Sequence, residues 1–376
     1  MNIVFWSDSY VPSIAANSIQ VLKMCNALTN SGHEVCLYAK KPHGTPNNLK
    51  DINNIYGIDS IFDIKILKSN PDIKHLDYDF KICWKIMKGK PDLIYTRNIR
   101  SAIISSILSI PTILELHYLP VTIFSKLALK RLHKSPHCKN IVVISNKLKN
   151  VILQKYPYIN ESEIQVAHDA VDLDRFNFNH NANKITKEVL ELNPDNKTAV
   201  YVGHLYPGRG IKMILKLAKS LSNINFLIIG GHFNDIKTYQ DYAYKNHINN
   251  IKFVGFVPNS QLPHYYALAD VLLMPYQKKV EVSGGGDTSE WMSPMKTYEY
   301  MATGKPIISS DLPALREVLN ESNAILVEPD NVEDWKYHIE NTLTNTILAT
   351  KISFNARMCA ESNTWDDRVS KILGHL

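Results

Sequence analysis

The segment from Trp291 to Val318 carries residue types that could bind a phosphate and a sugar. It reads WMSPMKTYEYMATGKPIISSDLPALREV, and Ser293 followed by Pro294 is typical of an N-cap and the first residue of a helix. The Gly-Lys-Pro further along would end that helix. Free amides at a helix N-terminus attract phosphate, and Glu299, more than one turn inside, could accept hydrogen bonds from vicinal sugar hydroxyls. Taken alone, the pattern also fits a well-capped surface helix with a solvated glutamate.

A second phosphate-binding pattern lies earlier, in YVGHLYPGRG from Tyr201 to Gly210. An apolar strand would end at Gly203, a Pro-Gly turn follows, and Arg209 stands just before the next helix. A guanidinium in such a strand–loop–helix turn can bind phosphate oxygens in a bidentate manner. The pattern is not the GxGxxG of dinucleotide-binding proteins, and it lacks their acidic residue about twenty positions later. An ordinary turn with a surface arginine is the alternative for this segment alone.

Alternating strands and helices are expected to position both segments. The chain begins with an apolar run at residues 3–6, a helix over 18–30 closed by Gly32, and a strand over 35–39, which together form a βαβ unit. Such units imply a parallel sheet with right-handed crossovers. A second series of the same kind begins at residues 198–202. With 376 residues, the sequence predicts an α/β protein with two Rossmann-like, doubly wound parallel-sheet domains that face each other across a cleft.

Composition and charge exclude several classes of protein. Apolar residues make up 45% and charged residues 21%, and the net charge of +6 suits anionic small molecules or an acidic membrane better than nucleic acid. The five cysteines are scattered without a CxxC pair, which indicates reduced thiols rather than disulfides or a zinc site. Met1 leads straight into the first strand without the basic region of a signal peptide, and the most apolar stretch is too short to span a bilayer. We expect a cytoplasmic protein.

Taken together, the segments resemble family 4 glycosyltransferases of the GT-B fold. The resemblance rests on VGHLYPGRG, then FVGFVPNSQLPHYYALADVLLMPY, then the segment at 291–318, in that order. In the first half NALTNSGHEVCLYA, ELH at 115–117, VVIS, and HDAVD at 168–172 fit as well. It covers nearly the whole chain. It implies a hexosyltransferase-like, retaining enzyme that moves a sugar from a nucleotide-diphosphate sugar to a glycan, as in capsule, O-antigen, lipopolysaccharide or related polysaccharide synthesis.

The resemblance implies that the donor binds in the C-terminal half. Arg209 matches the basic residue that binds the diphosphate, and Glu299 matches the second glutamate of the Glu-x7-Glu motif, which holds the ribose. The backbone that recognises the base matches residues 256–258, and the loop at 293–296 matches the amides that meet the phosphates and the sugar. The donor-binding set expected on this basis is Gly203, His204, Arg209, Phe256, Val257, Ser293, Pro294, Met295, Lys296 and Glu299.

The N-terminal half supplies the other side of the implied reaction centre. His117 matches the histidine that approaches the transferred sugar, and we expect it to be catalytic together with Arg209. Ala15, Ala16 and Asn17 stand where many family members carry a Gly-Gly loop that faces the reaction centre, on the acceptor side.

The resemblance also suggests domain boundaries. Residues 1–172 are expected to form the acceptor-side domain and residues 173–360 the nucleotide-sugar donor domain, joined through the Asn-rich stretch at 177–193. The C-terminal helix, residues 361–376, is expected to pack back on the N-terminal domain.

Three positions depart from the family pattern. Trp291 stands in place of the first glutamate of Glu-x7-Glu, with Glu290 one residue early, and we interpret this as a variant of the motif. His204 replaces the usual arginine, so the diphosphate would be held with one permanent charge fewer. Alanines in place of the Gly-Gly pair limit how closely the backbone can approach a substrate.

A departing nucleoside diphosphate needs either a divalent metal or fixed cations and amide dipoles. The sequence shows no convincing metal-binding cluster, since its one Asp-x-Asp, at 172–174, lies near the expected linker. We therefore expect no metal and no other cofactor, with Arg209 and the helix after Ser293 stabilising the leaving group. One alternative is a GT-B protein that binds a nucleotide sugar without turning it over. Another, a Rossmann oxidoreductase, is disfavoured because the first βα loop, residues 7–17, contains no glycine.

The last feature concerns the acceptor. Residues 122–139 read TIFSKLALKRLHKSPHCK, which mixes apolar and basic side chains at helical spacing. Such a helix could lie on an anionic membrane through Lys126, Lys130, Arg131 and Lys134. The protein would then be peripheral on the inner face of the cell membrane, with a lipid-linked glycan as acceptor and no nucleic-acid partner. A solvated outer face of a crossover helix is the alternative.

Overall fold

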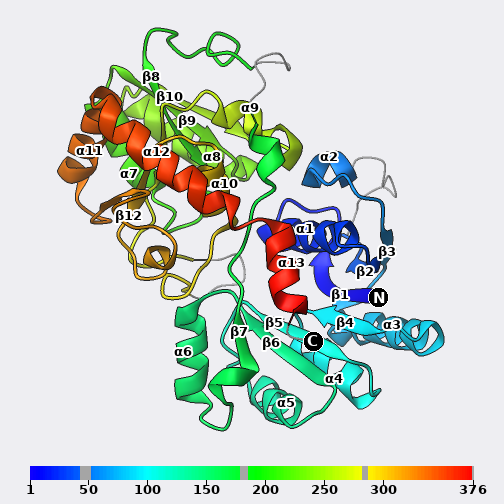
Figure 1. Cartoon of the computed structure of the whole chain (residues 1–376). Helices are drawn as coiled ribbons and strands as arrows, with labels where there is room; N and C mark the ends of the chain where they lie inside the picture. The colour runs from blue at the N-terminus through cyan, green and yellow to red at the C-terminus, as the bar shows by residue number, and fades with distance from the viewer. Residues whose placement is uncertain (43–51, 178–184, 282–286, 375–376) are drawn as a thin grey trace. The chain divides into compact units, whose positions relative to one another are not determined.

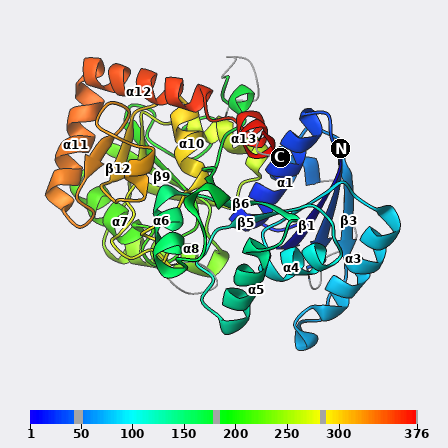
Figure 2. The same cartoon turned by 60° about the horizontal axis from the view of Figure 1, so that its bottom comes forward.

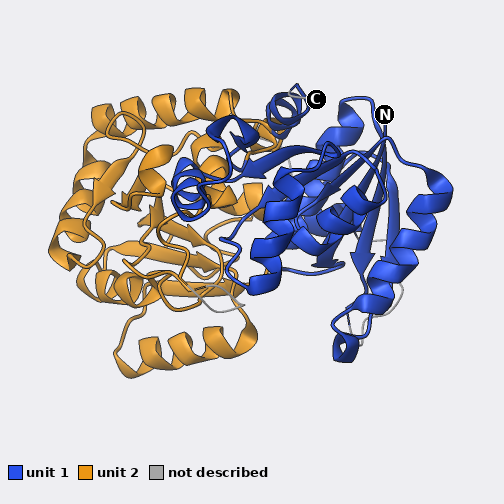
Figure 3. Ribbon diagram, turned by 90° about the horizontal axis from the view of Figure 1, so that it is seen from below, with its two compact units in different colours: residues 1–169, 365–376 blue, residues 170–364 orange. Residues whose placement is uncertain are grey.

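The computed structural model describes residues 1–42, 52–177, 185–281 and 287–374, so part of the expected linker lies outside the described residues. The chain divides into two compact units (Figure 3). Unit 1 contains Met1–Asp169 and Trp365–Leu376, and unit 2 contains Ala170–Thr364. The chain therefore returns to unit 1 for its last helix. We predicted domain boundaries after residues 172 and 360, whereas the two units divide after residues 169 and 364.

Unit 1 is built on a seven-stranded sheet in the order β3-β2-β1-β4-β5-β6-β7 (Figure 1). All neighbouring strands are parallel. The order reverses between β1 and β4, which is the switch point where doubly wound sheets bind ligands at the carboxyl ends of the strands. The strands are β1 (Asn2–Tyr10), β2 (Glu34–Lys40), β3 (Asp63–Leu67), β4 (Leu93–Thr96), β5 (Thr112–Leu116), β6 (Cys138–Val143) and β7 (Ile164–Val166).

The helices of unit 1 cover both faces of its sheet. Because the crossovers are right-handed, connections that lead toward one edge of the sheet place their helices on one face. Connections that lead toward the other edge place their helices on the opposite face. Accordingly α1 packs against α13 on one face, and α3, α4 and α5 pack in a row on the other (Figures 1 and 2). The helices are α1 (Ala16–Asn30), α2 (Ile52–Tyr56), α3 (Leu76–Gly89), α4 (Ile99–Ile107), α5 (Ile123–His133), α6 (Asn146–Lys155) and α13 (Trp365–Leu373).

Unit 2 repeats this design with a six-stranded parallel sheet in the order β10-β9-β8-β11-β12-β13. Its switch point lies between β8 and β11. The strands are β8 (Lys197–Val202), β9 (Ile224–Ile229), β10 (Ile251–Gly255), β11 (Val271–Met274), β12 (Ile307–Ser310) and β13 (Ile325–Val327). The helices are α7 (Ile211–Ser220), α8 (Phe233–Lys245), α9 (Leu262–Tyr266), α10 (Met295–Ala302), α11 (Val332–Thr344) and α12 (Thr346–Glu361).

The sequence forms these elements because its apolar residues follow two different periods. The strand β9, INFLII, is buried along its whole length, as expected for a strand with helices on both faces. The helix α7 buries its apolar residues on the core side and exposes three lysines. The predicted pair of Rossmann-like, doubly wound parallel-sheet domains is confirmed.

Candidate active site

The turn after β8 brings Arg209 to the carboxyl edge of the sheet of unit 2. Gly210 follows it with a φ of +84°, and a Cβ at this position would overlap the carbonyl oxygen of Pro275. The turn therefore packs tightly on the chain that leaves β11, which only glycine permits. Within this turn Arg209 is partly buried, and its Nη1 donates a hydrogen bond of 3.0 Å to the hydroxyl of Tyr276. Its buried Nε has no hydrogen-bond partner among the described residues.

A second cation stands beside the first. The Nζ of Lys296, from the first turn of α10, donates to the carbonyl of Val202 at 3.2 Å. It lies 4.1 Å from the ring centroid of Tyr201 and 4.5 Å from that of Tyr276. Burial, followed by repulsion from Arg209, holds the pKa of Lys296 well below its usual range.

Neither cation forms an ion pair within the described part of the chain. Two partly buried cations without a carboxylate at ion-pair distance are costly in isolation, and a bound anion would remove that cost. The arrangement therefore favours an anionic ligand at the carboxyl edge of β8.

The start of α10 differs from the prediction. Ser293 was expected as the N-cap and Pro294 as the first helical residue, but the helix begins at Met295 and its N-cap is Pro294. Proline's φ is compatible with the cap position, and the first turn closes when the amide of Thr297 donates to the Pro294 carbonyl at 2.9 Å. The amides available to an anion are therefore those at the first residues of this helix, beside Lys296.

Glu299 is held in place rather than freely solvated. One carboxylate oxygen accepts a 2.7 Å hydrogen bond from the buried hydroxyl of Tyr266, and the other lies 3.4 Å from the Nδ2 of Asn259. Asn259 is in turn bound by the guanidinium of Arg175. A carboxylate fixed by two donors on one side can accept hydroxyl hydrogens on the other.

His204 is neutral at neutral pH in this environment. Its ring stacks on that of Tyr206, with the centroids 4.8 Å apart, and lies near His232. Burial lowers the pKa of His204 to about 4, and the nearby Arg209 and His232 act in the same direction. Of the remaining expected donor-side residues, Phe256 is exposed, Val257 is buried, and both follow β10. Gly203 lies at the end of β8 next to the ammonium of Lys296.

In unit 1, His117 belongs to a buried network centred on Glu115. This carboxylate, the one charged residue of the apolar strand β5, accepts hydrogen bonds from the Nε2 of His117 at 2.5 Å and from the Nε2 of Gln20 at 2.8 Å. The Nη2 and Nη1 of Arg368, from α13, bind its two oxygens at 3.0 and 3.2 Å. The hydroxyl of Tyr95 also donates to Glu115. Five donors in all therefore converge on one buried carboxylate.

The charges of this network fix the state of His117. Burial raises the pKa of Glu115, but Arg368 and His117 outweigh it and hold that pKa well below its ordinary value. Burial and the neighbouring Arg97 lower the pKa of His117 to about 4. A neutral imidazole that donates its Nε2 hydrogen to Glu115 leaves Nδ1 as an acceptor. His117 can therefore accept a hydrogen bond from a ligand hydroxyl.

The loop at Ala15, Ala16 and Asn17 connects to the same network. Arg97 donates to the carbonyl of Asn17 at 3.3 Å and to the Oε1 of Gln20 at 3.0 Å. Ala15 is the N-cap of α1, where its amide is bound by the Oγ of Ser13 at 3.1 Å. The structure thus links the alanine loop to His117 through Arg97, Gln20 and Glu115.

Sequence reasoning missed four residues of this network: Gln20, Tyr95, Arg97 and Arg368. A glutamate inside the apolar strand TILEL was a usable signal, since a buried carboxylate requires donors. The position of its main partner was not predictable, because Arg368 is 253 residues further along the chain.

Two family descriptions match the chain in tandem. Residues 18–175 match Glycosyltransferase Family 4, and residues 183–358 match Glycosyl transferases group 1. Together these matches span most of unit 1 and most of unit 2. The chain combines two glycosyltransferase domains. We refer to them as the family 4 domain and the group 1 domain.

Relatives and solved structures agree with this assignment. An uncharacterized glycosyltransferase of Methanocaldococcus jannaschii is 23% identical over 322 residues, which is 81% of each chain. A putative teichuronic acid biosynthesis glycosyltransferase of Bacillus subtilis is 24% identical over 70% of this chain and 69% of its own. The Anabaena protein Alr3699/HepE, solved with UDP and glucose, superposes with a TM-score of 0.75 over both whole chains at 14% identity. That likeness establishes a GT-B fold.

The expected basic patch lies on the outer side of the family 4 domain. Lys126, Lys130, Arg131 and Lys134 are all exposed, on α5 or just after it, while Ala128, Leu129 and Leu132 pack inward. The same helix also exposes Ile123, Phe124 and Leu127. No helix within the described ranges has the length and apolarity needed to cross a membrane.

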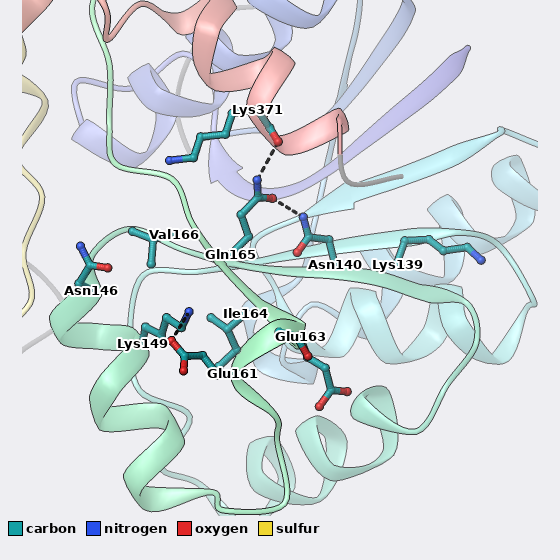
Figure 4. Close-up of a pocket in the computed structure, with 11 residues that line it drawn as sticks. Lys139, Asn140, Asn146, Lys149, Glu161, Glu163, Ile164, Gln165, Val166 and Lys371 are labelled. Carbon is teal, nitrogen blue, oxygen red and sulfur yellow. Dashed lines mark hydrogen bonds and ion pairs between the residues drawn. The ribbon is translucent and has the colours of Figure 1, made fainter.

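The family 4 domain also has a polar cavity of 740 Å³ at its edge strand β7 (Figure 4). There Gln165 lies between Asn140 and the main-chain carbonyl of Lys371 and binds both, and Lys149 pairs with Glu161 at 3.1 Å. The side chain of Gln165 therefore connects β7 to α13. Within the described ranges, no three His, Cys, Asp or Glu side chains come together to hold a metal ion.

Proposed function

We propose that the chain is a retaining, metal-independent glycosyltransferase that moves a hexosyl group from a nucleotide-diphosphate sugar to a glycan acceptor. The observation that carries this proposal is the pair of cations Arg209 and Lys296, which both contact Tyr276 and form no ion pair in the described chain. A diphosphate supplies the missing negative charge, and these fixed cations stabilise the further charge that develops as the nucleotide leaves.

The reaction we propose breaks the bond between the anomeric carbon and the diphosphate oxygen, which keeps the electron pair. The acceptor hydroxyl oxygen bonds to the same face of the anomeric carbon, so the configuration is retained. Its proton passes to the departing phosphate oxygen. Arg209, Lys296 and the first amides of α10 stabilise the leaving diphosphate, which is the task that a metal performs in other transferases. Activity should therefore survive excess EDTA, and a loss that magnesium or manganese restores would contradict metal independence.

Glu299 is proposed to hold the ribose of the donor. Its orientation by Tyr266 and Asn259 supports this role, because a fixed carboxylate can accept both vicinal hydroxyls. Glu299→Ala should weaken nucleoside-diphosphate binding by about tenfold, the effect of one lost charge-assisted hydrogen bond. Calorimetric titration measures this directly, and an unchanged affinity would remove Glu299 from the site.

The acceptor is proposed to be a lipid-linked glycan of surface-polysaccharide synthesis, such as capsule, O-antigen or lipopolysaccharide, at the cytoplasmic face of the membrane. The basic residues on α5 and the resemblance to a relative described for teichuronic acid biosynthesis support this proposal. A nucleotide-sugar-binding protein without turnover is the second candidate, favoured by Trp291 at the position of the first motif glutamate.

One screen tests the proposed donor class. Thermal shifts are measured with uridine, guanosine and adenosine diphosphate sugars, and a ligand at 100 times its Kd should stabilise the fold by roughly 2.7 kcal/mol. The uridine series comes first because the Anabaena structure contains UDP. Release of nucleoside diphosphate from the donor that binds then separates a transferase from a binding protein. If no member of the three series shifts the melting temperature, the proposal is wrong.

A further inference from the structure

The helix α3 has two apolar faces, although it lies at the surface of unit 1. One face packs on the core through Tyr78, Ile82 and Ile86. The other face points outward and exposes Phe80 by 74%, Met87 by 60%, Leu76 by 56% and Trp84 by 55%. These four residues recur at spacings of four, four and three, so they form one continuous stripe along the helix. An ordinary surface helix has a single apolar stripe, and that stripe faces the core.

A row of lysines borders this stripe. Lys81, Lys85 and Lys88 recur every three or four residues directly beside it. The ammonium of Lys88 lies 3.8 Å from the ring centroid of Trp84, and Lys81 pairs with Asp77 at 2.9 Å. An outward aromatic and aliphatic stripe with a basic border is the composition of a helix that lies in a membrane interface.

The helix α7 of unit 2 has a similar row of lysines but no exposed apolar face. It carries Lys212, Lys216 and Lys219 at the same spacing, and all three are exposed. Its apolar residues, however, are buried throughout. A lysine row on a crossover helix therefore does not by itself bring exposed aromatic residues with it.

The neighbouring helices also expose apolar side chains. The helix α4 packs against both α3 and α5, so the three lie in a row on one face of the sheet (Figure 2). Within this row α4 exposes Ile107, and α5 exposes Ile123, Phe124 and Leu127. Exposed apolar residues therefore occur on all three helices of this row.

We propose that the outer face of α3, made by Leu76, Phe80, Trp84 and Met87 with its lysine row, inserts into a bilayer that contains anionic lipid. The inference builds on the proposed lipid-linked acceptor, but the binding can be measured without any transfer. A second copy of the chain would fit the outer face of α3 less well than a bilayer does. An antiparallel two-fold pairing of α3 would set the two lysine rows against each other, whereas anionic headgroups neutralise them.

The test is cosedimentation with vesicles of equal parts phosphatidylglycerol and phosphatidylcholine, at low salt. The double variant Phe80→Ser/Trp84→Ser should lower the vesicle partition coefficient on the order of 30-fold or more, because two large side chains lose their burial. The triple variant Lys81→Gln/Lys85→Gln/Lys88→Gln should lower it on the order of 100-fold. Vesicles of phosphatidylcholine alone should bind the unaltered protein much more weakly.

Matched controls come from unit 2. Phe233 and Tyr244 are exposed to a similar or greater degree, so Phe233→Ser/Tyr244→Ser removes comparable apolar surface elsewhere. Lys212→Gln/Lys216→Gln/Lys219→Gln removes the same charge at the same spacing. Both controls should bind vesicles as the unaltered protein does. Equal losses in the α3 and control variants would overturn the inference, since the effect would then be general.

Trp84 reports insertion directly. Lipids brominated in the acyl chain should quench the tryptophan fluorescence of the unaltered protein, and Trp84→Phe should abolish the quenching while leaving most of the binding intact. Absence of quenching despite binding would show that α3 stays outside the bilayer. Absence of vesicle binding, or sedimentation as a dimer that Trp84→Ser dissolves, would also overturn the inference. Nucleoside-diphosphate binding should be unchanged in every α3 variant, so failure here leaves the proposed transferase standing.

Discussion

Both units place cations at the carboxyl ends of parallel strands, but a carboxylate neutralises the cation in one unit and not in the other. In unit 1, Arg368 binds both oxygens of the buried Glu115, so this cation and this carboxylate neutralise each other within the protein. In unit 2, Arg209 and Lys296 share Tyr276 and have no carboxylate partner among the described residues. The Arg368–Glu115 ion pair of unit 1 stabilises the fold, whereas the two cations of unit 2, which form no ion pair, favour the binding of an anion.

The largest expected effect concerns stability. Arg368→Met should destabilise unit 1 by about 3–5 kcal/mol, because it leaves the buried Glu115 without its counter-charge. Arg209→Met should change stability by no more than about 1 kcal/mol, because it removes one hydrogen bond but no ion pair. Thermal melts of the two variants give this comparison. In a third variant, Glu115→Gln combined with Arg368→Met should recover part of the loss. Equal losses in the two single variants would show that Arg368 and Arg209 contribute equally to stability.

The pH dependence of unit 1 follows from the same charges. The depressed pKa of Glu115 gives a stabilisation that is complete above its unfolded pKa and is lost as the pH falls through its folded pKa. The pKa of His117, lowered from 6.5 to about 4, acts in the same direction, because the unfolded state binds its proton first. Asp79 and Asp169, whose pKa values burial raises to about 6, act in the opposite direction, so the effect of His117 is measured against His117→Ala. The difference in melting temperature between the unaltered protein and His117→Ala should fall as the pH is lowered from about 6.5 to about 4. A difference that stays constant over this range would contradict the buried network.

The next effect concerns turnover. Arg209→Ala should lower the rate of transfer on the order of 10²–10³-fold, the usual consequence of removing one donor to a developing anion. The exposed Arg316 of the same unit, which pairs with Asp311 and Glu321, provides the control. Arg316→Ala should leave the rate nearly unchanged. Similar rates for the two variants would show that Arg209 is only a surface residue.

The smallest effect should appear at His117. His117→Ala should slow transfer on the order of 10- to 100-fold, the loss of one hydrogen bond to a bound sugar. Binding of nucleoside diphosphate should hardly change, because the proposed binding groups belong to unit 2. A turnover assay beside a calorimetric titration separates these results. Equal losses in both would mean that His117 acts through the structure of the protein.

The sequence predicted the fold because parallel strands and crossover helices leave distinct patterns, such as the continuous apolar run of β9 and the single stripe of α7. It placed Arg209 in a turn before α7 for the same local reason. It could not supply the partners of Glu115, since pairing across 253 residues depends on tertiary structure. Nor could it show that one apolar face of α3 points to solvent, because a helix with two apolar faces does not reveal which of them is buried.

We propose that the unmatched cations of unit 2 bind a diphosphate, and calorimetric titration with two nucleotides decides whether they do. The unaltered protein and Arg209→Ala are titrated calorimetrically with the nucleoside diphosphate that binds best and with its monophosphate. The unaltered protein should bind the diphosphate at least about tenfold more tightly, since the second phosphate adds at least one charge-assisted hydrogen bond. Arg209→Ala should lose most of that difference. Equal affinity of the unaltered protein for the two nucleotides, or a preference unaffected by Arg209→Ala, would show that these cations do not bind the diphosphate.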